Sequence, residues 1–474
     1  MSERPGGDLR RSSAPPLRSR LFASAAVLAV SLTSFGAQAE TIGGALSKAY
    51  LNNPDINQQR AAVRVADENI PRANAGYLPS VSAQADVGRE YTTVGGVGAA
   101  SGSNVTTPRG YGVTASETIF NGNRTKNQIS QAESGVMAAR ETLRNTEQNV
   151  LLSALTDYMD VLRDTAILDL QRSNVDVLQE QLRQTRDRFN VGEVTRTDVA
   201  QAEASLAGAQ AQALTAQSTL QASIARYRQA VGDQPKNLTP VAPITRPLPR
   251  SLPDAIAISQ VEHPAIVASL HGVDSQLLNI KINEGALLPT AGVSASVNQR
   301  WDPSGYGSGV HVLTGQVLAQ VNVPIFDGGL SYANIRQAKE QLSQTELQTD
   351  LERDQVRAAV VAAWGSNTNS LGIVKAAKAQ VDAAEVALAG VREEAKVGQR
   401  TTLDVLNAQQ TLLNARVQLV GAQHDQVVNS YTLLSSVGRL STTSLGIAVA
   451  QYDPRVHFDQ VKNKWFGTRT PDGK

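Results

Sequence analysis

The chain of 474 residues contains no cysteine. This absence excludes structural disulfides, thiolate metal ligands, a catalytic cysteine and a lipid-anchored N-terminal cysteine. Aromatic residues make up only 4% of the chain, a composition that favours thin, closely packed helices over a bulky globular core. The formal net charge is +1 at pH 7, so no excess of positive charge indicates a nucleic-acid partner.

Long apolar runs are also scarce. One run, over residues 21–35, follows a group of arginines and is too short to span a bilayer as a helix. It is followed by Ala-Gln-Ala at residues 37–39, a small-x-small cleavage pattern. We therefore predict a signal peptide over residues 1–39 and a mature chain with a formal charge of −2. Beyond it no run of about 18 apolar residues occurs, so any membrane passage has to be made by strands.

Proline is absent from two stretches, residues 123–189 and 329–395. Because proline breaks helices, each stretch predicts one continuous helix, about 100 Å long at ~1.5 Å per residue. The first carries an apolar residue at every seventh position, as a coiled-coil seam requires: Val161, Leu168, Val175, Leu182 and Phe189. The helix that follows each stretch carries a row of large apolar residues beside a row of alanines, which lets neighbouring helices approach closely.

The chain repeats itself at an offset of 206 residues. The motif Val-Gly-x-x-Thr-x-x-Asp-Val begins at Val191 and again at Val397. Ile-Phe-Asn-Gly at residues 119–122 returns as Ile-Phe-Asp-Gly at residues 325–328. Such a tandem duplication predicts one structural unit built twice.

Each repeat contains two segments in which apolar and polar residues alternate with a period of two. The four expected strands are at about 80–91, 110–120, 290–301 and 310–325. Irregular loops rich in Gly and Ser separate the members of each pair, at residues 92–109 and 302–309. Strands of about ten residues with one apolar and one polar face are typical of outer-membrane barrels.

These elements divide the mature chain. The first repeat covers residues 40–238 and the second covers residues 254–440, with a proline-rich linker at residues 239–253. The tail at residues 441–474 shows no pattern that predicts a regular element. Each repeat is expected to follow the order helix, strand, strand, long helix, helix.

Four membrane strands cannot close on themselves. Inside a bilayer each unsatisfied strand-edge group costs several kcal/mol, so spanning strands must form a closed barrel. A barrel of eight strands is filled by its own side chains, whereas one of about sixteen leaves an aqueous channel. A conduit built from this chain therefore needs at least three copies, although this argument does not by itself select three.

The duplicated order and both Val-Gly-x-x-Thr-x-x-Asp-Val turns resemble the TolC family of outer-membrane efflux and secretion channels, from about Thr41 to Thr443. The resemblance implies a mainly α protein with a membrane β-barrel portion. A homotrimer would join twelve strands into one barrel, continuous with a periplasmic α-helical barrel. The chain would lie in the outer membrane, in contact with its lipid, and would extend into the periplasm. Residues Tyr452-Asp453-Pro454 and Trp465 look like members that serve type I secretion.

The resemblance also implies a docking surface. In the family the Val-Gly turns form the far periplasmic tips, where a periplasmic adaptor protein binds and links the duct to an inner-membrane transporter. The residues placed there are Val191, Gly192, Thr195, Val397, Gly398 and Thr401.

A gate at the same tips is implied as well. The family pattern places a cation at Arg400, with Thr197 and Asp198 of the other turn as its partners. Asp404 and Asn407 fall where the family carries two acidic rings, so Asn407 replaces one carboxylate, and Ala395 occupies a position that can be an aromatic gate link. The alternative is a plain Arg400–Asp404 pair on one helix, worth a few tenths of a kcal/mol.

Two other classes of protein fit the sequence less well. For an enzyme, the five histidines (His263, His271, His311, His424 and His457) are scattered and none has metal-ligand spacing. We therefore predict no catalytic residue, cofactor or metal. A periplasmic coiled-coil structural protein or adaptor would account for the helices but not for the four alternating strands. The sequence does not identify the cargo, which could be drugs, detergents, metals or secreted proteins.

Overall fold

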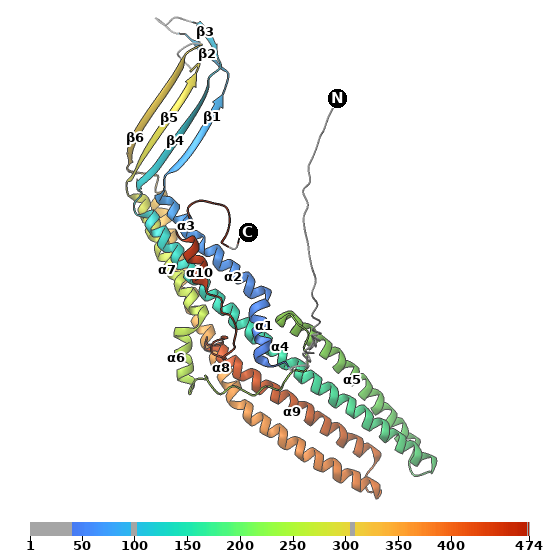
Figure 1. Ribbon diagram of the computed structural model, residues 1–474. Coiled ribbons are helices and arrows are strands. Elements are labelled where there is room, and N and C mark those ends of the chain that lie inside the picture. Colours follow the sequence, from blue (N-terminus) through green and yellow to red (C-terminus); the bar gives the residue numbers. More distant parts are fainter. Residues whose placement is uncertain (1–39, 96–101, 304–308, 472, 474) are drawn as a thin grey trace, which may run out of the picture. The chain divides into compact units, whose positions relative to one another are not determined.

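The computed structural model describes residues 40–95, 102–303, 309–471 and 473, so the predicted signal peptide lies outside the described residues. The two proline-free stretches form the helices α4 (Arg124–Asn190) and α8 (Leu330–Lys396), each of 67 residues. The prediction of two very long helices is therefore confirmed. In Figure 1 the strands lie at one end of these helices, and the turns that follow α4 and α8 lie at the other end.

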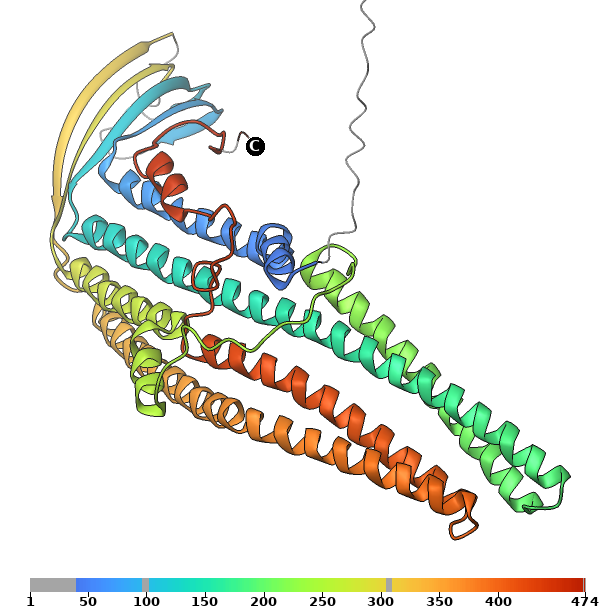
Figure 2. The ribbon, with the colours of Figure 1, turned by 60° about the horizontal axis from the view of Figure 1, so that its bottom comes forward.

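Each long helix packs against the helix that follows it. α5 (Arg196–Val231) returns along α4, and α9 (Thr402–Ser436) returns along α8, as Figure 2 shows. The α8–α9 seam buries large residues against alanines: Val381, Ala384, Leu388, Leu412 and Ala415. On α4 the predicted heptad row is buried at Val161, Leu168 and Leu182, but Phe189, in the last turn, is 42% exposed.

The main sheet contains four strands in the order β1-β4-β5-β6, all antiparallel. Their bounds are β1 Ser80–Val87, β4 Arg109–Phe120, β5 Thr290–Trp301 and β6 His311–Asn322. The register aligns the apolar residues into rows that cross the sheet, such as Val81, Ala115, Ala295 and Val317. A neighbouring row on the opposite face is polar: Ser82, Thr114, Ser296 and Gln316. The sheet therefore has one apolar face and one polar face.

The first strand pair differs from the sequence-based expectation. β1 ends at Val87 rather than near residue 91. The strand is interrupted at Gly88, and the chain continues as a second strand, β2 (Glu90–Val94). β2 pairs with β3 (Gly102–Thr106), so the loop expected at 92–109 is in part a separate hairpin. The Tyr, Thr and Val residues of these two short strands favour extended structure.

Shorter helices cover the long ones from their middle to the end that joins the strands (Figure 1). They are α1 Ile42–Asn52, α2 Pro54–Asp67, α3 Asn69–Asn74, α6 Leu252–Glu262 and α7 Pro264–Glu284. The largest hydrophobic core of the described residues lies where α1, α2 and α6 meet α4, α5 and α9, and it includes the fully buried rings of Tyr158 and Tyr227. The short 3-10 helices η1 (Ala75–Tyr77) and η2 (Gly285–Leu287) then lead into β1 and β5.

A close backbone approach holds the joint between strands and helices. Gly122 has φ +68°, and a Cβ atom there would lie 2.2 Å from the carbonyl oxygen of Gly285. Only glycine fits this approach in this backbone conformation.

The tail contains one regular element that the sequence did not predict. α10 (Pro454–Val461) begins with Asp453 as N-cap and packs against α2. It is only eight residues long, too short for a clear periodic signal.

Candidate functional site: the tips of the two helical hairpins

The end of α4 is a Schellman turn. Gly192 adopts φ +80°, its N–H donates to the carbonyl of Phe189 at 3.0 Å, and the N–H of Glu193 donates to the carbonyl of Arg188 at 2.9 Å. These two bonds satisfy carbonyls that the helix end would otherwise leave unpaired. A glycine is favoured at the left-handed position because a Cβ atom is strained there.

The start of α5 is a capping box. The Thr195 hydroxyl accepts from the N–H of Asp198 at 3.3 Å, and the Asp198 carboxylate accepts from the N–H of Thr195 at 2.9 Å. Together the two motifs fix a short, rigid connection between α4 and α5.

The second hairpin repeats this geometry. Gly398 has φ +78°, and its N–H donates to Ala395 at 3.3 Å. The Thr401 hydroxyl accepts from the N–H of Asp404 at 3.2 Å, and the Asp404 carboxylate accepts from the N–H of Thr401 at 2.9 Å. Val191 and Val397, the first residues of the two motifs, are each 72% exposed. Both tips thus present an apolar side chain on a preformed turn.

The capping boxes assign a local role to the two aspartates. Hydrogen bonds from the Thr195 hydroxyl, and then from its N–H, lower the pKa of Asp198. The N–H of Thr401, and then its hydroxyl, lower the pKa of Asp404 in the same way. Helix capping therefore accounts for an Asp at the same position in both turns whether or not a gate exists.

Arg400 forms an ion pair within its own hairpin. Its Nε donates to Oε2 of Glu394 at 2.8 Å, and this bond raises the pKa of Arg400. In the described part of the chain, no hydrogen bond or ion pair joins Arg400 to Thr197 or Asp198 of the other tip. Thr197 is exposed, and so is Asn407 one turn into α9.

The sequence did not indicate a charged pair on the polar face of the sheet. Nη2 of Arg300 on β5 donates to both carboxylate oxygens of Asp86 on β1, each at 3.1 Å. Gly110 of β4 lies between them in the register, and the absence of a side chain there lets Arg300 reach across the strand. The partners are 214 positions apart, so no short-range pattern could have identified them.

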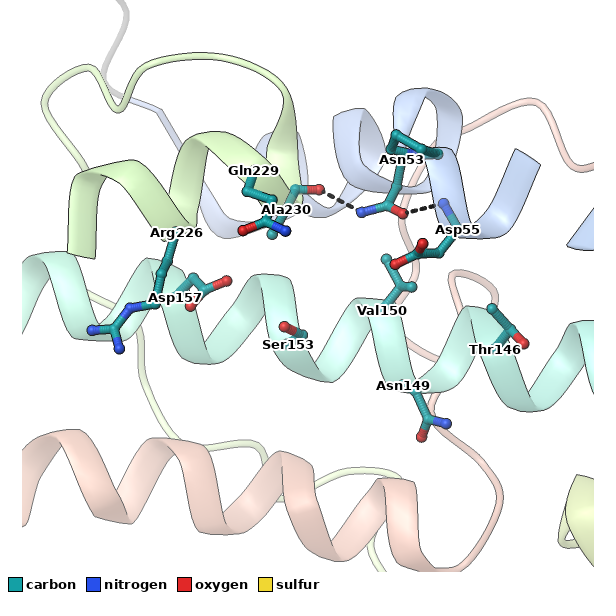
Figure 3. A pocket seen from close by; sticks show the side chains of 11 residues that line it. Asn53, Asp55, Thr146, Asn149, Val150, Ser153, Asp157, Arg226, Gln229 and Ala230 are labelled. Atoms are coloured by element: carbon teal, nitrogen blue, oxygen red, sulfur yellow. Dashed lines mark hydrogen bonds between the residues drawn. The ribbon is translucent and has the colours of Figure 1, made fainter. Parts of the chain in front are cut away.

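A hollow of about 670 Å³ lies between α2, α4 and α5 (Figure 3). Asn53 closes it at one end by donating to the carbonyl of Ala230 at 3.0 Å. Burial raises the pKa of Asp157, and the side chains of Asp157 and Arg226 lie side by side in Figure 3. Its lining includes Ser153 but no histidine that could act as a base.

Among the described residues, no group of three or more His, Asp or Glu side chains is placed to hold a metal ion. None of the helices in the described ranges combines the length and apolar character needed to cross a bilayer.

A long helical hairpin repeated twice, joined to a sheet with one apolar face, defines the class of outer-membrane channels with a periplasmic helical extension. The family model described as "Outer membrane efflux protein" matches residues 45–233 and 256–439. The chain belongs to this family.

Relatives and solved structures agree with this family assignment. The chain is 43% identical to the outer membrane efflux protein BepC of Brucella suis biovar 1 (strain 1330), over 94% of this chain and 95% of BepC. It is 26% identical to the alkaline protease secretion protein AprF of Pseudomonas aeruginosa, over 66% of each chain. The fold is similar to that of the Campylobacter jejuni CmeC outer membrane channel, with a TM-score of 0.75 at 16% identity over 89% of each chain.

The predicted fold class is therefore confirmed, and the protein is an outer-membrane exit duct that extends into the periplasm. Its family and its structural neighbours are channel proteins rather than enzymes.

Proposed function

We propose that three copies of the chain close one antiparallel barrel of twelve strands. The observation that carries this proposal is the strand order: within the described residues, β1 and β6 are the two edges of a four-stranded sheet. Unpaired edges are too costly in a bilayer. β1 and β6 run in opposite directions, so β6 of one copy is able to continue the antiparallel order by pairing with β1 of the next.

The hairpin tips serve in this proposal as the docking surface of a periplasmic adaptor. Val191, Gly192 and Thr195 form one half of the surface, and Val397, Gly398 and Thr401 form the other half. Exposed valines on two equivalent rigid turns support this role, because a preformed surface loses little entropy when it binds. The adaptor links the duct to an inner-membrane transporter, and the duct itself is a passive conduit without catalytic activity.

The tips also carry the proposed gate. Arg400, Thr197, Asp198, Asp404 and Asn407 are its residues, and Arg400 exchanges Glu394 for Asp198 when neighbouring hairpins meet in the closed trimer. The half-exposed guanidinium of Arg400 supports this, because an exposed ion pair such as Arg400–Glu394 is weak and is easily exchanged for another.

Conductance in planar bilayers tests the gate. Arg400→Ala is expected to raise the conductance of the closed purified trimer, since the link between hairpins is lost. Glu394→Gln is the matched control, because it removes only the partner within the same hairpin and is expected to leave the conductance low. Unchanged conductance in Arg400→Ala would remove the gate assignment.

Asp198 needs a separate pair of variants, because it also caps α5. Asp198→Gln keeps a side chain that completes a capping box at the third helical position but removes the negative charge that would pair with Arg400. Asp198→Ala removes the cap and the gate partner together. If the charge holds the gate closed, both variants conduct more than the wild type while the trimers remain assembled; a Gln variant that conducts as little as the wild type would leave Asp198 with its capping role alone.

The same proposal takes residues 1–39 as the export signal, 40–238 and 254–440 as the repeats with 239–253 as their linker, and 441–474 as a periplasmic tail. A periplasmic structural or adaptor protein is the second candidate, but the membrane-type sheet argues against it. Drug-susceptibility and secreted-protein profiles of a deletion strain would distinguish efflux cargo from type I secretion cargo.

A further inference from the structure

Two large aromatic side chains stand exposed after α10. Trp465 and Phe466 are each 78% exposed, and their ring centroids lie 5.7 Å apart. Exposing this much apolar surface at adjacent positions is costly in water, so the pair points to a partner.

The helix before this pair is firmly docked. Nδ1 of His457 lies 2.9 Å from Oδ2 of Asp67 on α2, and the side chain of Asp67 is fully buried. Val461, one turn further along α10, is also fully buried. The guanidinium of Arg140 on α4 lies 5.1 Å from the ring centroid of Phe458. α10 is therefore fixed to the helices, and the aromatic pair projects from a defined place.

That place is next to the membrane strands. Nδ2 of Asn74, the last residue of α3, donates to the carbonyl of Lys462 at 3.1 Å. Six residues after Asn74 the chain enters β1 at Ser80, and three residues after Lys462 it reaches Trp465. Three residues extend at most about 10 Å. Figure 1 shows α10 beside α3 near the foot of the strands.

Positive charge accompanies the rings. Lys464 directly precedes Trp465, and Arg469 follows Phe466 by three residues. The ammonium of Lys464 donates to the backbone carbonyl of Arg469, which folds this segment back on itself. A tryptophan beside cationic side chains is typical of sites at the boundary between lipid and water.

We propose that Trp465 and Phe466 enter the headgroup region of the periplasmic leaflet of the outer membrane, with Lys464 and Arg469 beside anionic phosphate groups. The occupant is the lipid surface rather than another protein, because the pair lies close to the start of β1 and carries charge complementary to anionic lipid. The proposal rests on the assignment of β1, β4, β5 and β6 as membrane strands.

Tryptophan fluorescence provides the test, because the chain contains only three tryptophans: Trp301, Trp364 and Trp465. Replacing Trp301 and Trp364 by Phe leaves Trp465 as the single reporter in the full-length trimer. Reconstitution into bilayers that contain phospholipids with brominated acyl chains is expected to reduce Trp465 emission relative to unbrominated bilayers. The loss is expected to be greater with brominated phosphatidylglycerol than with brominated phosphatidylcholine, and Lys464→Gln with Arg469→Gln should remove that difference.

Two control proteins, each with a single tryptophan at position 301 or 364, accompany the Trp465 measurement. Trp301 lies at the far end of β5 on the apolar face and should be quenched, whereas Trp364 on α8 packs against the helical core and should not. If Trp301 is quenched and Trp465 is not, the proposal is wrong, while the assignment of the membrane strands remains valid. A contact of Trp465 and Phe466 with a neighbouring copy would give this result. If neither is quenched, the strand assignment itself fails.

Discussion

At the scale of single residues, the tips depend on two glycines in a left-handed conformation. A Cβ atom at Gly192 or Gly398 would meet nothing within 4 Å, so a substitution there strains the backbone without causing a clash. The strain is on the order of 1–2 kcal/mol for most residues and smaller for Asn. We expect Gly192→Val or Gly398→Val to abolish efflux without loss of trimer, and the matching Asn variants to retain more activity. Drug susceptibility with a measurement of trimer amount checks this, and normal resistance in the Val variants would exclude the tips as the docking surface.

The contacts of His424 predict a dependence of helix stability on pH. Its Nε2 lies 3.0 Å from Asp160 on α4, and its Nδ1 lies 2.9 Å from Asp425. Burial acts to lower the pKa of His424, but the ion pair with Asp160 and the hydrogen bond with Asp425 outweigh burial and raise the pKa, even with Arg163 nearby. Because the pKa of His424 is higher in the folded protein, its protonation stabilises the folded state. This stabilisation is complete below the pKa of the unfolded chain, about 6.5, and is lost as the pH rises through the pKa of the folded protein.

We therefore expect the wild-type trimer to lose thermal stability as pH rises from about 6 through the raised pKa of His424. His424→Gln should lack this part of the pH dependence. Melting curves followed by circular dichroism at a series of pH values compare the two. If the melting temperatures of both proteins change with pH in the same way, the pair of protonated His424 on α9 with Asp160 on α4 contributes nothing to the stability.

The sequence showed the aspartates of both turns as repeated positions, and the family resemblance assigned them to a gate. Their capping role was not predicted, although each partner lies only three positions away in a known capping pattern. The Arg400–Glu394 pair was missed because six positions separate its members across a turn, where neither helical nor strand spacing applies.

At the scale of elements, one glycine lets the Arg300–Asp86 pair reach across a strand of the sheet. A Cβ atom at Gly110 would lie 2.8 Å from the backbone oxygen of Gln299 and 3.0 Å from Cγ of Arg300. Because that oxygen belongs to the adjacent strand, the β4–β5 ladder would have to shift. Gly110→Ala is expected to lower the temperature at which the trimer dissociates in SDS. Gly315→Ala on β6 is the control, since its Cβ would meet nothing within 4 Å, and equal dissociation temperatures would contradict the expectation.

The long elements were predictable and the short ones were not. α4 and α8 follow from the absence of proline and from heptad spacing, which are properties of the local sequence. The β2–β3 hairpin escaped prediction because each of its strands has only five residues, too few for a clear alternation. α10 escaped prediction because its formation depends on a contact with a distant part of the chain. For α10 that contact is the His457–Asp67 pair, which joins positions 390 residues apart.

At the scale of the whole molecule, four membrane strands per chain require at least three copies for a conduit but do not by themselves select three. The strand order adds a specific expectation, because it identifies β1 and β6 as the edges to be joined. Neighbouring copies then meet at the same contact each time, β6 of one copy with β1 of the next. The barrel therefore closes without a free strand edge.

Oxidative cross-linking across that seam tests the account most directly, and the absence of native cysteine means that every disulfide is an introduced one. One cysteine is placed at Val317 on β6, and a second is moved along β1 through Val81, Ala83 and Ala85. Within one copy two strands separate these positions, so an intramolecular bond is not possible there. We predict that at least one pair yields covalent species of two and three chains and none larger. A ladder beyond three chains, or no cross-link at any position, would contradict the closed three-copy barrel.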